Sequence, residues 1–264
     1  MARVVIVTGG GSGIGAAVAR TAGDDTRVVI CGRRRSALDR VAAETGALPI
    51  VADVTSEQDV GALVAEVVAT FGRLDGVVAN AGVMRAGTVL TLTPEDWETS
   101  LRTNLTSGYL LARAALPHLI ASSGAFVAVS SIAALRVPSG ASAYAASKAG
   151  LTMLTQTIAA DFGPQGVRAN VVCPGWVRTE MADEEMREFG QPLGLDREEA
   201  YAEITRLVPQ RRPAAPEEAA AAVVWLLSSA ASYVNGAVLT VDGGTTLLDP
   251  GTLAFDFTIR PRGG

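Results

Sequence analysis

The sequence has 264 residues, of which 48% are hydrophobic and 19% are charged, a size and composition that suit one α/β domain with a sizeable core. Its net charge of −5, without a stripe rich in lysine or arginine, excludes a nucleic-acid partner held through its phosphates. No apolar stretch reaches the roughly 20 residues that span a bilayer, so we expect a cytoplasmic protein that does not contact membranes.

Strand-length runs rich in β-branched residues alternate with longer helix-compatible segments along the chain. Several runs are apolar almost throughout, as in parallel strands covered on both faces. Right-handed crossovers between such strands predict a single-domain α/β fold, a doubly wound (Rossmann) parallel sheet of seven strands. The predicted strands are 4–8, 27–31, 48–51, 76–79, 125–130, 168–173 and 237–241.

Two segments depart from this alternation. Residues 176–216 contain several prolines and alternating charges, and we interpret them as a substrate lid within a dinucleotide-binding domain that spans 1–244. Residues 245–264 form a tail that keeps some apolar side chains, and we expect it to pack at a subunit interface. The two cysteines, Cys31 and Cys173, lie in strand-like runs without C-x-x-C spacing, which predicts reduced core thiols and no metal site.

A glycine-rich turn follows the first predicted strand and opens the first helix. Without side chains the backbone can approach a pyrophosphate, and the helix N-terminus offers free N–H groups and the positive end of its dipole. An ordinary glycine-rich turn is the alternative, which the order of strand, turn and helix disfavours. The residues expected to hold the dinucleotide here are Thr8, Gly9, Gly11, Ser12, Gly13, Ile14 and Gly15.

The end of the second predicted strand bears on which nicotinamide cofactor is used. An acidic residue at this position normally holds the ribose 2′-hydroxyl, but the sequence has Cys31-Gly32-Arg33. The Arg33 guanidinium suits a 2′-phosphate, so NADP(H) is favoured and NAD(H) is the alternative. Arg34 is a second candidate for this contact, and the basic cluster could also be merely a solvated helix start.

Polar and glycine residues also follow the third and fourth predicted strands, at the edge of an open α/β sheet where ligands bind. Asp53, followed by Val54, could accept from the adenine amino group or could cap a helix. In Asn80-Ala81-Gly82, the asparagine amide could tie neighbouring loops together, and Gly82 would permit close approach to the cofactor. A plain turn explains this second segment almost as well.

The residues predicted to carry the chemistry are Ser131, Tyr144 and Lys148. Ser131 follows the fifth predicted strand, and the i, i+4 spacing of Tyr144 and Lys148 places both on one helix face. A tyrosine is a poor acid or base at neutral pH unless a cation stabilises its phenolate, and Lys148 could supply that cation. Ser131 could hold the substrate oxygen while Tyr144 gives or takes the proton. Taken alone, a tyrosine and lysine at this spacing are more often a surface pair.

Together these motifs resemble the short-chain dehydrogenase/reductase family, from the first strand to residue 244. The match rests on T-G-x-x-x-G-x-G at 8–15, Asp53-Val54, Asn80-Ala81-Gly82, Ser131, the Y-A-A-S-K run at 144–148 and Pro174-Gly175. The resemblance implies a hydride transfer between a nicotinamide cofactor and a carbonyl or alcohol substrate, with a homotetramer or homodimer as the assembly.

Further roles are implied by the resemblance alone. Asn104 would be a fourth catalytic residue, holding a water that links Lys148 to a proton relay, and Lys148 would also bind the nicotinamide ribose. Pro174 and Gly175 would lie beside the nicotinamide, and the Val177 backbone and the Thr179 hydroxyl would contact its carboxamide. Ser12 departs from the family pattern, since many members that prefer NADP have a basic residue at this position, which weakens the cofactor prediction.

The sequence identifies the substrate less well than the reaction. Several apolar residues near the predicted lid suit an apolar ketone or secondary alcohol, although they could equally be the core of the lid. A 3-oxoacyl thioester reductase and a non-enzymatic dinucleotide-binding sensor are alternatives, but a sensor would not need Tyr144 or Lys148. Too few residues follow position 167 for the extra domain of a sugar-nucleotide dehydratase or epimerase. The apolar candidates are Met84, Leu135, Val137, Trp176, Met181, Met186 and Phe189.

Overall fold

Seven parallel strands form one sheet in the computed structural model, which describes residues 2–249. The strands are β1 (Arg3–Thr8), β2 (Thr26–Gly32), β3 (Leu48–Val51), β4 (Gly76–Ala79), β5 (Ala125–Val129), β6 (Arg168–Pro174) and β7 (Val238–Val241). The helices are α1 (Gly13–Thr21), α2 (Arg35–Thr45), α3 (Glu57–Phe71), α4 (Pro94–Leu101), α5 (Ser107–Ser122), α6 (Ser142–Phe162), α7 (Glu180–Gly190), α8 (Arg197–Ile204) and α9 (Pro216–Leu227). All seven strands lie within one residue of the predicted bounds.

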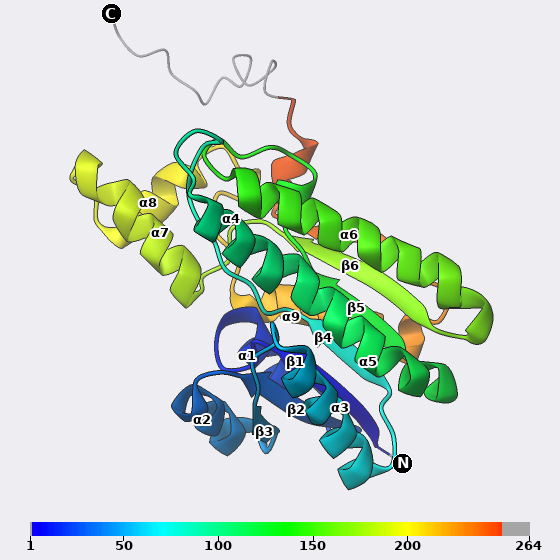
Figure 1. The fold of residues 1–264 in the computed structure, drawn as a ribbon. Coiled ribbons are helices and arrows are strands. Elements are labelled where there is room, and N and C mark those ends of the chain that lie inside the picture. The colour runs from blue at the N-terminus through cyan, green and yellow to red at the C-terminus, as the bar shows by residue number, and fades with distance from the viewer. Residues whose placement is uncertain (1, 250–264) are drawn as a thin grey trace, which may run out of the picture.

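The sheet order is β3-β2-β1-β4-β5-β6-β7, so the chain reverses its direction of travel between β1 and β4 (Figure 1). Every pairing in the sheet is parallel, because a helical crossover separates each strand from the next. The predicted doubly wound α/β fold of a single domain is therefore confirmed. Its C-terminal strand edge at the β1–β4 switch point is where such sheets bind ligands.

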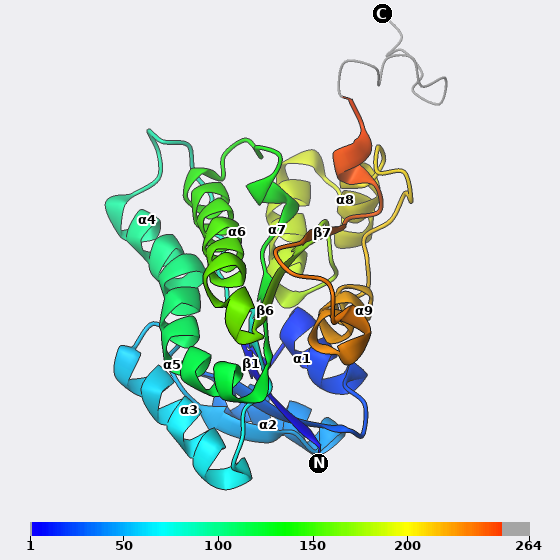
Figure 2. The ribbon, with the colours of Figure 1, turned by 90° about the vertical axis from the view of Figure 1, so that its right-hand side faces the viewer.

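Alternating side chains of each strand enter two separate hydrophobic cores. On one face, Val4 and Ile6 of β1 pack with helices α3, α5 and α6, and on the other face Val5 and Val7 pack with α1, α2 and α9. Figure 2 shows these layers from the side, with α5 and α6 to the left of the sheet and α1 and α9 to its right. Cys31 and Cys173 are buried and free, as predicted.

The predicted lid between β6 and α9 is largely helical. It contains α7, the 3₁₀ turn Gln191–Leu193 and α8, and its buried residues form a small cluster of their own. This cluster joins Ala182 and Met186 of α7 to Ala200 and Tyr201 of α8, apart from the two main cores. The two helices therefore pack on each other at one end of the molecule (Figures 1 and 2).

The ends of the described chain add two findings. Thr245–Leu247 forms a 3₁₀ turn, and the rest of the predicted interface tail, residues 250–264, lies outside the described residues. Among residues 2–249, no helix combines the length and the apolar character that crossing a membrane requires.

Candidate active site

The glycine loop after β1 leaves the N-terminus of α1 open to a ligand. Ser12 occupies the N-cap position, but its side chain caps no backbone N–H group, and the first turn contains no acidic residue. Gly13 adopts a φ of +52°, a left-handed conformation that disfavours any residue with a Cβ atom. The first N–H groups of α1 are thus available to an anion, as pyrophosphate binding requires.

Gly15 is packed too closely for any side chain. A Cβ atom there would lie 2.4 Å from the Gly9 carbonyl oxygen and 2.6 Å from Nδ2 of Asn80. Gly11 lies against α2, where a Cβ atom would be 3.1 Å from that of Ala37, whereas the partly buried Ile14 packs into the core on the α1 side. The loop therefore forms a tight cradle, and its close packing is possible only because these positions are glycine.

Thr8 and Asn80 join the loop after β1 to the segment after β4. The Thr8 hydroxyl donates to the Val78 carbonyl oxygen at 3.1 Å and accepts from the backbone N–H groups of Asn80 and Ala81 at 3.0 and 3.1 Å. The Asn80 amide donates back to the Thr8 carbonyl oxygen at 2.8 Å. Asn80 therefore ties the two neighbouring loops together, the structural role considered for it from the sequence.

The three arginines after β2 have different partners. Arg34 donates to Glu180 of the lid at 2.9 Å, and its other contact is with the Ser12 hydroxyl at 3.5 Å. Arg35 pairs with Asp39 in the next turn of α2. Arg33 is exposed and makes no hydrogen bond or ion pair with the part of the chain that the structure describes, although its charge helps lower the pKa of Asp53.

Asp53 folds back on its own turn. Its Oδ1 atom accepts from the backbone N–H group of Thr55 at 2.9 Å and from the Thr55 hydroxyl at 2.8 Å, and these two bonds are the main cause of its lowered pKa. The cap of α3 is Ser56, whose side chain accepts from the Asp59 backbone, so Asp53 is not the helix cap that the sequence allowed. Val54 beside it is buried in the core.

Ser131, Tyr144 and Lys148 come together where β5 meets α6. Lys148 is only 4% exposed, and its Nζ atom donates to the Val129 carbonyl oxygen at 2.9 Å and lies 5.8 Å from the centre of the Tyr144 ring. Ser131 lies close enough to the Tyr144 phenol to lower its pKa. The three side chains therefore form one polar group at the C-terminal edge of the sheet.

Burial dominates the titration of this group. Desolvation raises the pKa of Tyr144, with the Ser131 hydrogen bond opposing it, and lowers the pKa of Lys148 from 10.5 to about 8. Lys148 does not lower the pKa of Tyr144, because its own pKa of about 8 leaves it uncharged in the pH range where Tyr144 titrates. Tyr144 thus carries its proton at neutral pH.

Asn104 lies in a π-helical turn, Arg102–Thr106, between α4 and α5. Its Oδ1 atom accepts from the Val83 backbone at 2.8 Å, and its Nδ2 atom donates to the Val83 carbonyl oxygen at 2.9 Å and to the Ser147 hydroxyl at 3.0 Å. A Cβ atom added at Gly82 would lie 3.3 Å from Oδ1 of Asn104 and 3.4 Å from Nζ of Lys148. Both amide protons are used, so a water held by Asn104 would have to donate to one of its oxygen atoms, Oδ1 or the main-chain carbonyl.

The segment after β6 leads from the sheet into the lid. Pro174 is buried at the end of β6, and a Cβ atom at Gly175 would lie 2.9 Å from Cα of Asp242, so this position requires glycine. Val177 is buried and pairs with Ala214 in an isolated bridge. The lid is thereby anchored to the sheet at its start.

Thr179 is the N-cap of α7, as its residue type suggests. Its Oγ1 atom accepts from the Ala182 backbone at 3.2 Å, which leaves the hydroxyl proton free to be donated. A Cβ atom at Gly13 would lie 3.1 Å from Cγ2 of Thr179. The start of the lid therefore rests against the glycine loop, and the predicted cofactor residues of 8–15 and 174–179 share one site.

Sequence reasoning missed two contributors to this site. Ser147 joins Asn104 to α6, since its hydroxyl accepts from Asn104 and donates to the Tyr144 carbonyl oxygen at 2.8 Å. Glu185 of the lid acts on Tyr144 electrostatically and raises its pKa. The position of Ser147 beside Lys148 was an available signal, whereas Glu185 stood among four lid acids with nothing to separate it.

Comparison with known proteins decides the family. The profile of the family described as enoyl-(acyl carrier protein) reductase matches residues 9–246. The chain belongs to the short-chain dehydrogenase/reductase family. As a member of that family it is an oxidoreductase acting on CH–OH or C=O groups with a nicotinamide cofactor, as predicted from its sequence.

Two relatives and one structure illustrate the likeness of this short-chain dehydrogenase/reductase. It is 45% identical over 260 residues to the protein MoaE of Klebsiella aerogenes, covering 97% of this chain and all of that one. It is 35% identical over 255 residues to meso-2,3-butanediol dehydrogenase of Serratia marcescens, covering 94% and 96%. An actinorhodin polyketide ketoreductase with NADPH superposes with a TM-score of 0.88 at 32% identity, covering 92% of this chain and 97% of that one.

The donor set of the site fits a nicotinamide dinucleotide. The open N-terminus of α1 and the glycine cradle supply N–H groups and room for phosphates. Within residues 2–249, no three His, Cys, Asp or Glu side chains are grouped as metal ligands would be. The reaction class therefore requires an organic cofactor to carry the hydride.

Proposed function

We propose that this enzyme transfers a hydride between NADP(H) and a ketone or secondary alcohol, with Tyr144 as the general acid and base. The observation that carries the proposal is the polar group in which Tyr144 lies beside Ser131 and the buried Lys148. When bound, the cofactor supplies or accepts the hydride.

Each side chain of the group has its own role in this proposal. During reduction, Ser131 holds the substrate oxygen and Tyr144 donates its proton to that oxygen, which a tyrosine that stays protonated at neutral pH can do. Lys148 uses one of its donors on Val129, which leaves others for the ribose hydroxyls. Asn104 fixes the segment at Val83 beside α6, and one of its oxygen atoms would hold the relay water.

The cofactor residues follow from the cradle. The pyrophosphate would be bound by Gly9, Gly11, Ser12, Gly13, Ile14 and Gly15. The adenine would contact Asp53 and Val54. The ribose side would be supported by Thr8, Asn80, Ala81 and Gly82. The nicotinamide would lie beside Pro174, Gly175, Val177 and Thr179. Thr179 would donate its free hydroxyl proton to the carboxamide.

The decisive experiment measures oxidation of NADPH and of NADH by the purified protein across ketones, quinones and 3-oxoacyl thioesters. We expect turnover of an apolar ketone, with kcat/KM higher for NADPH than for NADH. Faster turnover of the thioesters would instead favour the 3-oxoacyl thioester reductase. Tight binding of NADPH with no turnover of any class would contradict the enzyme and favour a dinucleotide sensor.

Arg33 is the residue that we propose to select NADP(H), because it alone of the three arginines keeps its guanidinium free of ion pairs within the described chain. Arg33→Asp should lower kcat/KM for NADPH roughly 10- to 100-fold, because it removes a charge-assisted contact with the 2′-phosphate and adds a repulsive charge. The same substitution should leave kcat/KM for NADH nearly unchanged or raise it.

The matched control is Arg35→Asp, which makes the same change of charge at a residue whose partner is Asp39. It should leave the ratio of the two cofactors near that of the wild type. Equal ratios in both variants would reject Arg33 and transfer the role to Arg34 or Ser12.

We also propose how the chain is organised and assembled. Residues 1–244 form the dinucleotide-binding domain with the lid at about 176–216, in a cytoplasmic homotetramer or homodimer that neither nucleic acid nor membrane binds. Exposed Tyr109 on α5 and Met153 on α6 support packing of these helices against another subunit. Light scattering of the purified protein tests the assembly.

A further inference from the structure

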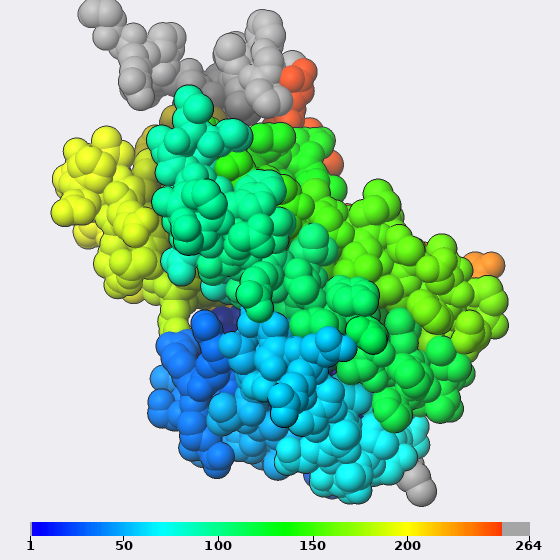
Figure 3. Space-filling model, in the orientation of Figure 1, coloured from blue at the N-terminus to red at the C-terminus, as the bar shows by residue number. Residues whose placement is uncertain are grey.

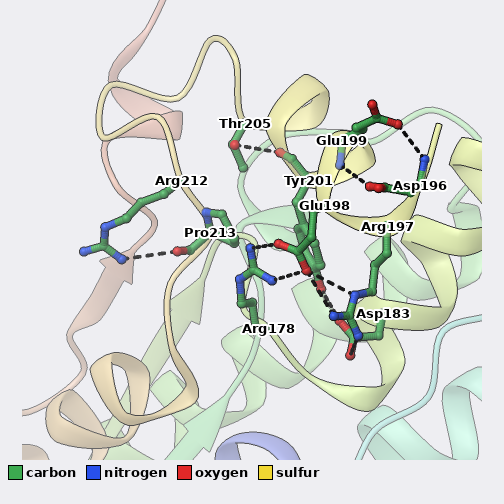
Figure 4. A network of polar contacts seen from close by, with 10 residues as sticks. All are labelled: Arg178, Asp183, Asp196, Arg197, Glu198, Glu199, Tyr201, Thr205, Arg212 and Pro213. Atoms are coloured by element: carbon green, nitrogen blue, oxygen red, sulfur yellow. Dashed lines mark hydrogen bonds and ion pairs between the residues drawn. The ribbon is translucent and has the colours of Figure 1, made fainter.

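One partly buried charged side chain of the lid has no partner among the described residues. Glu185 of α7 makes no hydrogen bond or ion pair with any residue in the described range 2–249, and it is partly buried. The other acids of the same helix turn are committed: Asp183 accepts from the Tyr201 hydroxyl at 2.9 Å and pairs with Arg197, and Glu184 pairs with Arg187 (Figure 4 shows the Asp183 contacts).

Helix geometry explains why Glu185 stands apart. Ala182 and Met186 point toward α8, where they pack with Tyr201. Glu185 lies one residue, about 100°, away from Met186, in line with Met181 and Phe189 at spacings of four residues. Those two side chains are 38% and 37% exposed, so this face of α7 presents a carboxylate between two apolar residues that the rest of the described chain leaves partly uncovered.

The helix that carries this face begins at the glycine loop, where a Cβ atom at Gly13 would lie 3.1 Å from Cγ2 of Thr179. The Glu185 charge raises the pKa of Tyr144, so the carboxyl group and the phenol are close enough to interact through protein. In Figure 3 the surface is recessed where the yellow-green α7 segment faces the blue glycine-loop region, which places this helix at the border of the cofactor site. Burial, with a smaller effect of Glu188, raises the pKa of Glu185 to about 7.

We propose that Glu185 binds a protonated amine of the substrate, next to the alcohol or carbonyl served by Tyr144, and thereby determines substrate specificity. The inference rests on the proposed hydride transfer. A partly desolvated carboxylate without a partner gains most from a cation, because a charge-assisted hydrogen bond replaces the lost hydration. Met181 and Phe189 would cover the apolar remainder of such a substrate, and anionic substrates would be repelled.

Three alcohols of similar size test the charge requirement. They are 2-amino-1-phenylethanol, which carries the ammonium group, 1-phenyl-1-propanol, which replaces it with a methyl group, and 3-hydroxy-3-phenylpropanoate, which carries a carboxylate. In each oxidation the carbinol would lose a hydride to NADP⁺ and its hydroxyl proton to Tyr144, as Tyr144 releases the proton that it carries to solvent, and the product is the ketone. At about pH 8 Glu185 is mostly ionised and the amine is still protonated.

We expect the wild type to favour the amino alcohol over 1-phenyl-1-propanol by at least about tenfold in kcat/KM, with the carboxylate the poorest substrate. Glu185→Gln should reduce this ratio about tenfold or more. Glu184→Gln removes the same charge from the neighbouring position, whose side chain pairs with Arg187, and should leave the ratio unchanged. A wild type without the preference, or a Glu185→Gln variant that retains it, would overturn the assignment.

A binding measurement separates this inference from the proposed function. If no alcohol is oxidised, the hydride transfer fails for this class, and calorimetric titration of the NADPH-bound protein with 2-amino-1-phenylethanol still tests Glu185. Binding that is about tenfold weaker in Glu185→Gln than in the wild type would sustain the amine site. Equal binding in the two proteins would reject it. Thermal unfolding of each variant verifies that glutamine, which has nearly the same shape, leaves the fold intact.

Discussion

Replacing Tyr144 with phenylalanine is expected to lower kcat by about 100- to 10,000-fold while leaving NADPH binding unchanged. The substitution removes the proton that Tyr144 donates to the substrate oxygen in the proposed reduction. The ring remains to fill its place, so the loop that binds the phosphates is undisturbed. Steady-state kinetics with the best ketone of the panel, together with a fluorescence titration of NADPH, measures both quantities.

Tyr109→Phe is the matched control for this experiment. Tyr109 lies on α5 with 47% of its surface exposed, so losing its hydroxyl should not affect kcat. Full activity in Tyr144→Phe would refute the proton-transfer role outright. Loss of NADPH binding along with activity would mean that the hydroxyl supports the cofactor rather than the chemistry.

Replacing Lys148 with methionine is expected to abolish activity and to stabilise the protein without cofactor. Burial holds the pKa of Lys148 at about 8, whereas in the unfolded chain it returns to 10.5, so the folded state carries the cost of a buried ammonium group at neutral pH. Methionine fills a similar volume without charge. The gain at pH 7 should be about 2 kcal/mol in the free energy of unfolding, after allowance for the hydrogen bond lost at Val129.

The sign of this effect with pH provides the check. Between pH 8 and 10.5 the unfolded lysine binds more protons than the folded one, so wild-type stability from this group rises with pH. The advantage of Lys148→Met should therefore be largest below pH 8 and should shrink as pH rises above it. Denaturant unfolding of both proteins at about pH 7 and pH 9.5 measures the difference. An advantage that stays constant with pH would show that packing, not charge, is responsible.

The sheet was predictable because its evidence is local. Each strand is a short β-branched run, and the pattern of strand, glycine turn and helix at 4–20 is typical of a backbone that approaches a ligand. Ser131, Tyr144 and Lys148 were predictable as a group because the ends of parallel strands meet at one edge. Local patterns therefore sufficed for the fold and the position of the site.

The remaining details depend on contacts distant in sequence. Arg34 was considered as a phosphate ligand, but its partner Glu180 lies 146 residues further along the chain. The ammonium group of Lys148 turns toward Val129 because a buried carbonyl oxygen lies there, which no spacing of residues reveals. Glu185 differs from the neighbouring acids in its position on α7, from which its charge affects the pKa of Tyr144. These choices are made by tertiary packing.

The π-helical turn at Arg102–Thr106 has a consequence for how the length of this chain can vary. A π turn holds one residue more than an α turn, so deleting a single residue there would convert α4, the turn and α5 into one regular helix. Such a helix would be intrinsically easier to form, yet everything before the deletion would rotate by about 100° relative to α5. Asn104 would then lose Val83 or Ser147. A single-residue insertion or deletion at this turn should therefore disturb the site through Asn104.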